Sequence, residues 1–170
     1  MSRHELLDIV DRNDNVIGQE PKSNKLSKEL ISRNVGVFIL DENQKLLIAR
    51  RSPDKKSFPG RFDLAACGNV KTGETYEEAA RRELAEELGI DCNLEFLDKV
   101  FNEFRENKLA LRYFTGLFVG RHSGDVNLNK ELTETRRLSV KEIEDMLNRD
   151  RNSFCPGFVR DFLHVKDRLK

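Results

Sequence analysis

Short hydrophobic runs along this chain predict strands over the first two thirds and helices near the C-terminus. Residues 6–10 and 16–18 flank a polar turn at 12–15, which is typical of an N-terminal β-hairpin. Residues 35–40 and 45–50 are separated by a polar tetrapeptide and predict a second hairpin. The other elements that we expect are a short helix at 25–32, strands at 62–66, 94–104 and 109–119, with a turn at 106–107 and a last strand ending near 138, and helices at 140–147 and 158–169, the latter begun by Pro156-Gly157.

Residues 75–89 carry the clearest helix signal in the sequence. Thr75 followed three residues later by Glu78 is a capping box, and Gly89 can supply the left-handed residue that ends a helix. Every fourth residue between them is apolar or small, which predicts one helix face packed on a sheet. That stripe is formed by Tyr76, Ala80, Leu84 and Leu88.

Three carboxylates lie on a neighbouring face of the same helix. Glu83, Glu86 and Glu87 stand at i, i+3 and i+4, within an arc of roughly 100°. Like charges at this spacing repel, and a hard divalent cation such as magnesium or manganese would neutralise them. The alternative is an ordinary solvated acidic face. Arg82 could offer a forked donor to Glu86 or reach back to Glu74.

The segment 68–90 resembles the Nudix box at every required position. It reads glycine, five residues, Glu74, seven residues, Arg82-Glu83, an aliphatic residue, any residue, Glu86-Glu87, any residue, Gly89 and an aliphatic residue. The resemblance to the Nudix hydrolase (MutT-like) family implies an α/β/α sandwich with a mixed sheet. It also implies magnesium-dependent attack of water on a diphosphate linkage, usually in a nucleoside diphosphate derivative, with manganese as the other candidate metal.

The same resemblance assigns roles within the box. Glu83, Glu86 and Glu87, with Gly68, are the expected metal ligands, and the three glutamates with Arg82 form the expected catalytic group, supported by Glu74. A bound metal would shield the diphosphate and lower the pKa of a water molecule. A general base is still required, and our hypothesis is Glu83, because neighbouring carboxylates can raise the proton affinity of a glutamate.

The basic loop 50–60 precedes the box and is suited to binding phosphate. Arg51 can bind an anion with two hydrogen bonds, and Lys55 adds a mobile charge, so both are candidate substrate ligands, with a solvated basic loop as the alternative. Arg51, Lys55 and Cys67 also resemble positions of the type I isopentenyl diphosphate isomerases, which are Nudix relatives. In that subgroup the matching cysteine is catalytic.

Several parts of the isomerase pattern are missing. Asn69 stands where a histidine is required, residues 22–33 contain no histidine, and Lys108 replaces an aligned glutamate. The complete acidic box therefore favours hydrolysis, with Cys67 as a buried small residue. A Nudix-like domain that binds a nucleotide without turnover is the third alternative. Glu131 and Glu134 are further candidate acidic ligands, although solvated loop glutamates are more common.

Composition sets wider limits. The chain has 170 residues, with 30 basic and 30 acidic residues, and it lacks an apolar run near the ~20 residues of a membrane span. We expect one domain over 1–170, with an N-terminal extension at 1–33, a core at 34–140 and C-terminal helices at 141–170. A small-molecule diphosphate is the expected partner, rather than nucleic acid or membrane. The cysteines suit a reducing cytoplasm, and the N-terminal hairpin could cover a sheet edge or form a homodimer.

Overall fold

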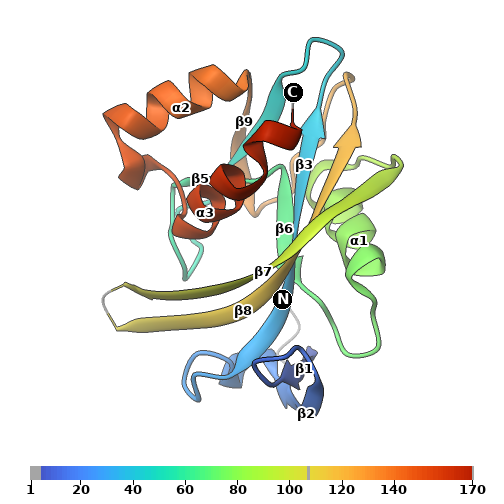
Figure 1. The fold of residues 1–170 in the computed structure, drawn as a ribbon, viewed down its shortest axis with the longest axis vertical. Coiled ribbons are helices and arrows are strands. Elements are labelled where there is room, and N and C mark those ends of the chain that lie inside the picture. The colour runs from blue at the N-terminus through green and yellow to red at the C-terminus, as the bar shows by residue number, and fades with distance from the viewer. Residues whose placement is uncertain (1–4, 107, 170) are drawn as a thin grey trace.

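A mixed β-sheet lies between helices on its two faces (Figure 1). In the computed structural model, which describes residues 5–106 and 108–169, this sheet has seven strands and is accompanied by a separate two-stranded sheet near the N-terminus. Helix α1 covers one face, and α2 and α3 cover the other. The architecture is the predicted α/β/α sandwich.

Strands are the main regular element of the described chain. Their bounds are β1 Leu6–Val10, β2 Val16–Pro21, β3 Ile31–Leu40, β4 Leu46–Arg51, β5 Phe62–Asp63, β6 Ala66–Asn69, β7 Leu94–Glu106, β8 Leu109–Arg121 and β9 Leu132–Leu138. The α-helices are α1 Tyr76–Leu88, α2 Val140–Arg149 and α3 Pro156–Val165. Short 3₁₀ turns occur at η1 Lys22–Asn24, η2 Arg151–Ser153 and η3 Lys166–Arg168.

Strand β3 organises the large sheet. The main strand order is β5-β4-β3-β8-β7, with β6 also paired to β3 and β9 also paired to β4. The β3–β8 pairing is parallel, whereas the other pairings are antiparallel. In the predicted hairpin of β3 and β4, the two strands pair only at Leu40 and Leu46. The rest of β4 pairs with β9 and β5 instead.

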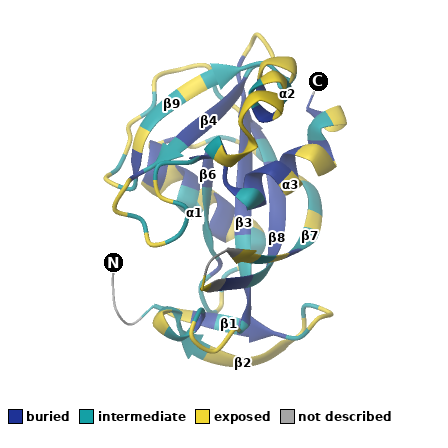
Figure 2. Cartoon of the chain, turned by 90° about the vertical axis from the view of Figure 1, so that its left-hand side faces the viewer, coloured by how far each residue is buried: buried dark blue, intermediate teal, exposed yellow. Residues whose placement is uncertain are grey.

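Two apolar cores separate the layers. Ala80, Leu84 and Leu88 of α1 pack with Val35 and Val37 of β3 on one face. The other core joins the sheet to α2 and α3 and contains a stack of three rings, with centroid separations of 5.0 Å and 5.5 Å. Those rings belong to Phe154, Phe158 and Phe162. Burial on both faces explains why β3 and β4 are continuous hydrophobic runs (Figure 2).

The N-terminal hairpin is fixed to the main body through its turn. Asp14 accepts hydrogen bonds from Arg33 Nε at 2.6 Å, Lys99 Nζ at 2.7 Å and the Tyr76 hydroxyl at 3.0 Å. Leu7 adds an antiparallel bridge to Lys71 beyond β6. The hairpin therefore contacts β3, β7 and α1 through one carboxylate, while β2 remains the more exposed strand (Figure 2).

Two sequence predictions about local structure are wrong. The helix expected at 25–32 is replaced by turns, because Ile31 and Ser32 already pair with Arg112 and Tyr113 in the parallel ladder. Glu29, just before β3, has a left-handed φ of 51°, which is incompatible with a continuing helix. The strand expected at 62–66 is two short strands, β5 and β6, which pair with β4 and β3 respectively.

The other predicted elements form with shifted ends. Helix α3 begins at Pro156, earlier than predicted, and becomes a 3₁₀ turn after Val165. Strands β7 and β8 pair as the predicted hairpin, although Asn107 of its turn lies outside the described residues.

Asp161 of α3 introduces a pH dependence into the packing of this helix. Burial, opposed by a hydrogen bond from Asn102 Nδ2, raises the pKa of Asp161 from 3.8 to about 7. Between these values the folded protein binds more protons than the unfolded chain, so the free energy of unfolding falls as pH rises from about 4 to 7. We expect Asp161→Asn to flatten this slope and to stabilise the protein at pH 8 by about 1–4 kcal/mol, measured by urea unfolding.

Asp145→Asn is the matched control for this measurement. Its carboxylate is half exposed and pairs with Lys141 four residues away, so the change should be below about 0.5 kcal/mol. A slope in Asp161→Asn equal to that of the wild-type protein would contradict the assignment.

Candidate functional site

Helix α1 presents the acidic face, and both of its ends are fixed by local chemistry. Thr75 Oγ1 accepts a hydrogen bond from Glu78 N at 3.2 Å, and Thr75 N donates to Glu78 Oε2 at 2.8 Å. Gly89 ends the helix with a φ of 66°. Since these caps set where the helix begins and ends, they also set the rotation that points Glu83 and Glu87 toward the sheet.

Glu83 lies directly against the backbone of β6. A Cβ placed on Gly68 would stand 2.2 Å from Glu83 Oε1, so glycine is required for this close approach. The Glu83 side chain is 13% exposed. Burial and the charges of Glu86 and Glu131 raise the pKa of Glu83, while Arg82 opposes the rise.

Arg82 connects the helix to the loop and strand before it. Its Nε and Nη2 donate to the two oxygens of Glu74 at 2.6 Å and 2.9 Å, Nη2 also donates to Asn69 O at 2.9 Å, and Nη1 donates to Glu83 Oε1 at 2.7 Å. Of the two partners expected from sequence, Glu74 takes the forked pair, and Glu86 lies 3.5 Å away. The hydrogen bonds to Glu74 are the main cause of the raised pKa of Arg82.

Glu87 is the most buried carboxylate of the acidic face. The residue is 5% exposed. Burial first, and then the charges of Glu83 and Glu131, raise the pKa of Glu87 well above its usual value, while Lys55 opposes them. Glu83, Glu87 and Glu131 therefore form a group of interacting negative charges at the inner side of α1.

The loop before β9 brings Glu131 and Lys55 to this group. Asn129 N donates to Glu87 O at 3.1 Å, and Ser52 N donates to Glu131 O at 2.8 Å, which ties this loop to α1 and to the 51–60 loop. Lys55 Nζ forms a short ion pair with Glu131. Burial raises the pKa of Glu131, but this ion pair outweighs burial and lowers it overall.

Arg51 lies on the inner side of the basic loop. Its side chain is 16% exposed, with Nε donating to Ser57 O at 3.1 Å and Nη1 lying 3.4 Å from Asp63 Oδ2. The Cys67 thiol lies 3.5 Å from the same oxygen. Burial and the charges of Asp63 and Glu87 raise the pKa of Cys67 well above its usual value, so the thiol stays protonated at neutral pH.

The remaining candidates lie at the margin of this group. The Glu86 side chain is 54% exposed. Glu134 lies within β9, where it pairs with Arg50 at 3.3 Å and with Arg136 at 2.5 Å rather than with the carboxylate group. The structure thus brings Glu83, Glu87 and Glu131 together and leaves Glu134 outside.

The oxygen atoms at the inner side of α1 are the donors that could hold a divalent cation. Over residues 5–106 and 108–169, no three His, Cys, Asp or Glu side chains are already arranged as a metal-binding group. Arg82 holds Glu83, and Glu86 points to solvent. Even so, Glu83 and Glu87 keep raised pKa values despite the charges of Arg82 and Lys55, and oxygen donors of this kind suit magnesium or manganese.

Sequence reasoning missed three polar residues beside the site. Asp63 contacts Arg51 and Cys67, and Asn69 supplies the carbonyl that Arg82 binds. The Asn69 side chain also accepts a hydrogen bond from the buried amine of Lys25 at 2.9 Å. The position of Asn69 directly after Gly68, inside the Nudix box, could have indicated that it lies at the site. Lys25 lies in the segment where a helix was wrongly predicted, and the sequence around it gave no signal of a place near the site.

The fold is a sheet between two helical layers, and its site is an acidic, capped helix beside Gly68 of β6. Comparison with known protein families identifies the class of protein that has these features. The NUDIX domain family matches residues 30–158 of this chain. The chain therefore belongs to the Nudix family.

Its relatives include both hydrolases and isomerases. An uncharacterized Nudix hydrolase of Yersinia pestis is 42% identical over 159 residues, covering 94% of this chain and 82% of that protein. One from Nostoc is 47% identical over 91 residues, but the match spans only about half of each protein, 53% of this chain and 54% of the relative. Isopentenyl-diphosphate Delta-isomerase 1 of Aromatoleum aromaticum is 33% identical, covering 74% and 72%.

Solved structures agree with the fold. The crystal structure of DR0079 from Deinococcus radiodurans has a TM-score of 0.71 and 28% identity, covering 86% of this chain and 90% of that one. Across the described residues, no helix combines the length and the apolar character needed to cross a bilayer.

Replacing Arg82 tests its part in holding the site. Arg82→Gln removes the charged hydrogen bonds to Glu74 and Glu83, both largely buried, so we expect a loss of about 2–4 kcal/mol in the free energy of unfolding. Chemical denaturation measures this loss.

Arg81→Gln is the neighbouring control. Arg81 pairs with Glu77 at the surface, so its replacement should cost less than about 1 kcal/mol. An equal loss of unfolding free energy in the two variants would show that Arg82 stabilises the fold no more than a surface arginine does.

Proposed function

We propose that this protein is a magnesium-dependent hydrolase that cleaves a diphosphate linkage in a nucleoside diphosphate derivative or a related small molecule. One observation supports this most: the buried carboxylate Glu87, which interacts with Glu83, also lies close enough to the cationic loop residues Arg51 and Lys55 to interact with their charges. Opposite charges arranged in this way can take up a metal and a diphosphate together. Membership of the Nudix family supports the same reaction.

In the proposed site, Glu83, Glu86 and Glu87 with Gly68 would hold magnesium, and manganese could replace it. When bound, the metal would shield the diphosphate and lower the pKa of a water molecule. Arg51 and Lys55 would bind the phosphate oxygens, with Lys55 exchanging Glu131 for substrate. Arg82 would keep Glu83 in position through Glu74, and Glu83 would accept a proton from the attacking water.

Separate replacements test the assignment of the base. We expect Glu83→Gln to lower kcat by about 10²-fold or more and to weaken manganese binding less than Glu87→Gln does, because the amide keeps an oxygen donor for the metal but cannot accept the proton. Glu87→Gln should lose both turnover and manganese affinity. Turnover is followed by release of phosphate products from a panel of dinucleotides, nucleotide sugars and coenzymes, and affinity by manganese paramagnetic resonance.

Glu95→Gln, on the exposed face of β7, is the control and should behave as the wild-type protein does. Full turnover in Glu83→Gln would remove Glu83 as the base. Full turnover in Glu87→Gln would contradict the proposed metal site.

An isomerase that uses Cys67 is the second candidate, because a curated relative carries that activity in its name. The environment of Cys67 argues against it, since the thiol is held protonated beside Asp63. His164 bonds to Asp98 and His122 bonds to Asp125 O, both away from Cys67, and His4 lies outside the described residues.

Replacing Cys67 separates the two reactions. We expect Cys67→Ala to keep diphosphate hydrolysis within about twofold of wild type, because the polar partner of the thiol is Asp63 and the proposal gives Cys67 no role in binding or proton transfer. We expect no isomerised product when prenyl diphosphates are supplied. Isomerisation in the wild-type protein that disappears in Cys67→Ala would favour the isomerase instead. Metal-dependent binding of a nucleotide without any turnover would favour the non-catalytic alternative.

A further inference from the structure

The side chain of Lys25 is buried beside the Nudix box, and the proposed mechanism gives it no role. Its amine donates hydrogen bonds to Asn69 Oδ1 at 2.9 Å and to Asn34 Oδ1 at 3.3 Å. The amine also lies 5.3 Å from the ring centroid of Tyr113. Lys25 is only 8% exposed, whereas both asparagines are partly exposed. The asparagines are therefore the members of this cluster that a ligand can reach.

Lys25 decides how the two amides are oriented. A lysine amine donates hydrogen bonds, so it holds the oxygen of each amide toward itself and leaves the Nδ2 group on the opposite branch. Within residues 5–106 and 108–169, neither Nδ2 atom donates a hydrogen bond, and neither belongs to the buried polar atoms without a partner. Both Nδ2 groups are therefore open to solvent. An amide oxygen that accepts a hydrogen bond also makes the N–H groups of the same amide stronger donors.

The two asparagines lie directly opposite each other in the sheet. Asn34 of β3 pairs with Asn69 of β6 in the antiparallel ladder, which brings their Cβ atoms to about 5 Å. A Cβ on Gly68 would point at Glu83 of α1, so the next residue, Asn69, points to the other face of the sheet. Two amide donors therefore lie side by side on the face opposite the acidic helix.

The same face of β6 leads to the proposed phosphate ligand Arg51. Cys67 and Asn69 are two residues apart on one strand, so their side chains point the same way at a separation of about 7 Å. The Cys67 thiol and the Arg51 guanidinium both contact Asp63. A diphosphate held by Arg51 can therefore extend toward the amide pair.

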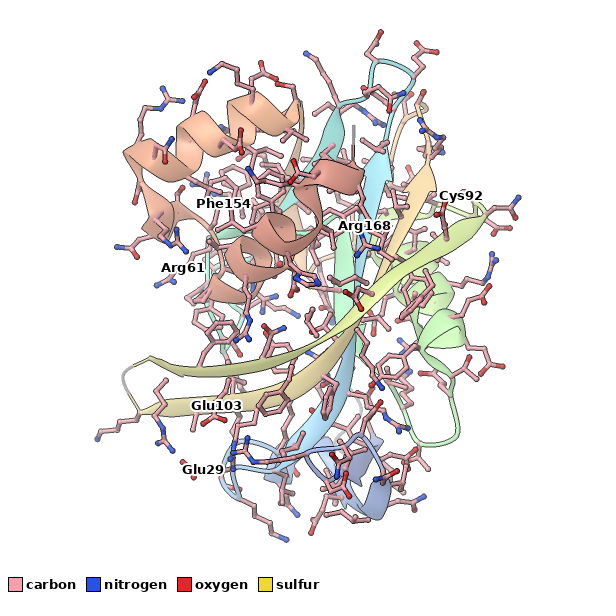
Figure 3. The ribbon with its side chains drawn as sticks, in the orientation of Figure 1. Glu29, Arg61, Cys92, Glu103, Phe154 and Arg168 are labelled. Atoms are coloured by element: carbon pink, nitrogen blue, oxygen red, sulfur yellow. The ribbon has the colours of Figure 1, made fainter. Side chains whose placement is uncertain are left out.

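The segment that carries Lys25 also borders the carboxylate group. Lys22 lies close enough to Lys25 and to Glu131 for its charge to act on both. Glu29, at the end of this segment, and Arg61, directly after the basic loop, lie on the same side of the molecule in the view of Figure 3. The N-terminal segment and the basic loop therefore approach the proposed site from two directions.

We propose that Asn34 and Asn69 are further ligands of the substrate diphosphate, each donating an Nδ2 hydrogen bond to a phosphate oxygen, and that Lys25 is the positioning residue that holds both amides in this orientation. The identity of the ligand rests on the proposed hydrolysis, whereas the orientation of the amides rests on the contacts of Lys25. A phosphate oxygen is the favoured acceptor because hydrogen bonds to a charged group are stronger than those to a neutral hydroxyl or ether.

Binding of a diphosphate that resists cleavage tests the pair directly. We measure methylenediphosphonate, in which carbon joins the two phosphorus atoms, by calorimetry with magnesium present. The wild-type protein should bind it, and Asn34→Ala/Asn69→Ala should weaken binding by about tenfold or more, because two hydrogen bonds to a charged acceptor are lost. Lys25→Met should weaken binding by about threefold or more, because the amides lose the donor that orients them.

Combining the variants separates positioning from any other role of Lys25. The triple variant Lys25→Met/Asn34→Ala/Asn69→Ala should bind methylenediphosphonate within about twofold of the double asparagine variant, since Lys25 would act only through the amides. The triple variant also removes the amine that the alanines would leave without acceptors. If the double variant does not fold, the triple variant should still bind about threefold more weakly than Lys25→Met.

Lys28→Met is the matched control. Lys28 belongs to the same segment, its side chain is half exposed, and it pairs with Glu20 at the surface, so this variant should keep the wild-type affinity.

The nucleotide analogue α,β-methylene-ADP distinguishes phosphate binding from binding of an organic group, and its affinity should fall as that of methylenediphosphonate does. A loss confined to the nucleotide analogue would overturn the proposal, because the amides would then meet the organic part. Absence of methylenediphosphonate binding in the wild-type protein, or unchanged affinity in the asparagine variants, would overturn it as well. A further loss when Lys25→Met is added to the double variant would contradict the positioning role.

This inference and the proposed function can fail separately. Hydrolysis that depends on Glu87, with no effect of the asparagine variants on methylenediphosphonate, would leave the function standing and remove the amide pair. Binding that falls in those variants, in a protein that hydrolyses no diphosphate, would keep the amides as phosphate ligands and remove the hydrolase.

Discussion

The site depends on the hydrogen bonds of one arginine. Arg82 holds Glu74, the carbonyl of Asn69 and Glu83 at once, and so fixes the acidic helix against β6. This contact is only feasible because Gly68 has no side chain where Glu83 lies. The planar guanidinium, with five donors, makes four hydrogen bonds here and binds both oxygens of Glu74, whereas a lysine has only three donors on one nitrogen. Gly68 and Arg82 therefore set the position of the Glu83 carboxylate.

Charge is distributed unequally around that contact. Glu74 is compensated by Arg82, and Glu131 by Lys55, whereas Glu87 is buried beside further negative charge. Burying a carboxylate beside others of the same charge costs stability, and a bound cation would lower that cost. Within a Nudix fold, this imbalance is the physical reason for proposing the metal site at the inner side of α1 rather than along its exposed edge at Glu86.

Local signals in the sequence predicted the parts of the molecule that local interactions decide. Thr75, Glu78 and Gly89 marked the ends of α1 because caps act within a few residues. The parallel pairing of β3 with β8 joins residues about 80 positions apart, which local sequence signals cannot predict. Because residues 31 and 32 take part in this pairing, the helix expected at 25–32 does not form. The sequence allowed Arg82 to pair with Glu74 or with Glu86. Glu74 is the partner because the loop before α1 places it beside Arg82 in the folded chain. Lys25 and Asp63 join the site through contacts across strands, which no spacing in the sequence reveals.

Anomalous scattering from crystals soaked in manganese would test the central claim most directly, since it locates the cation among identified oxygen atoms. The account predicts a single strong peak at the inner side of α1, within coordination distance of about 2 Å of carboxylate oxygens from Glu83 and Glu87, with Arg82 still bound to Glu74. Crystals that show manganese elsewhere, or these carboxylates turned apart with no peak between them, would contradict it.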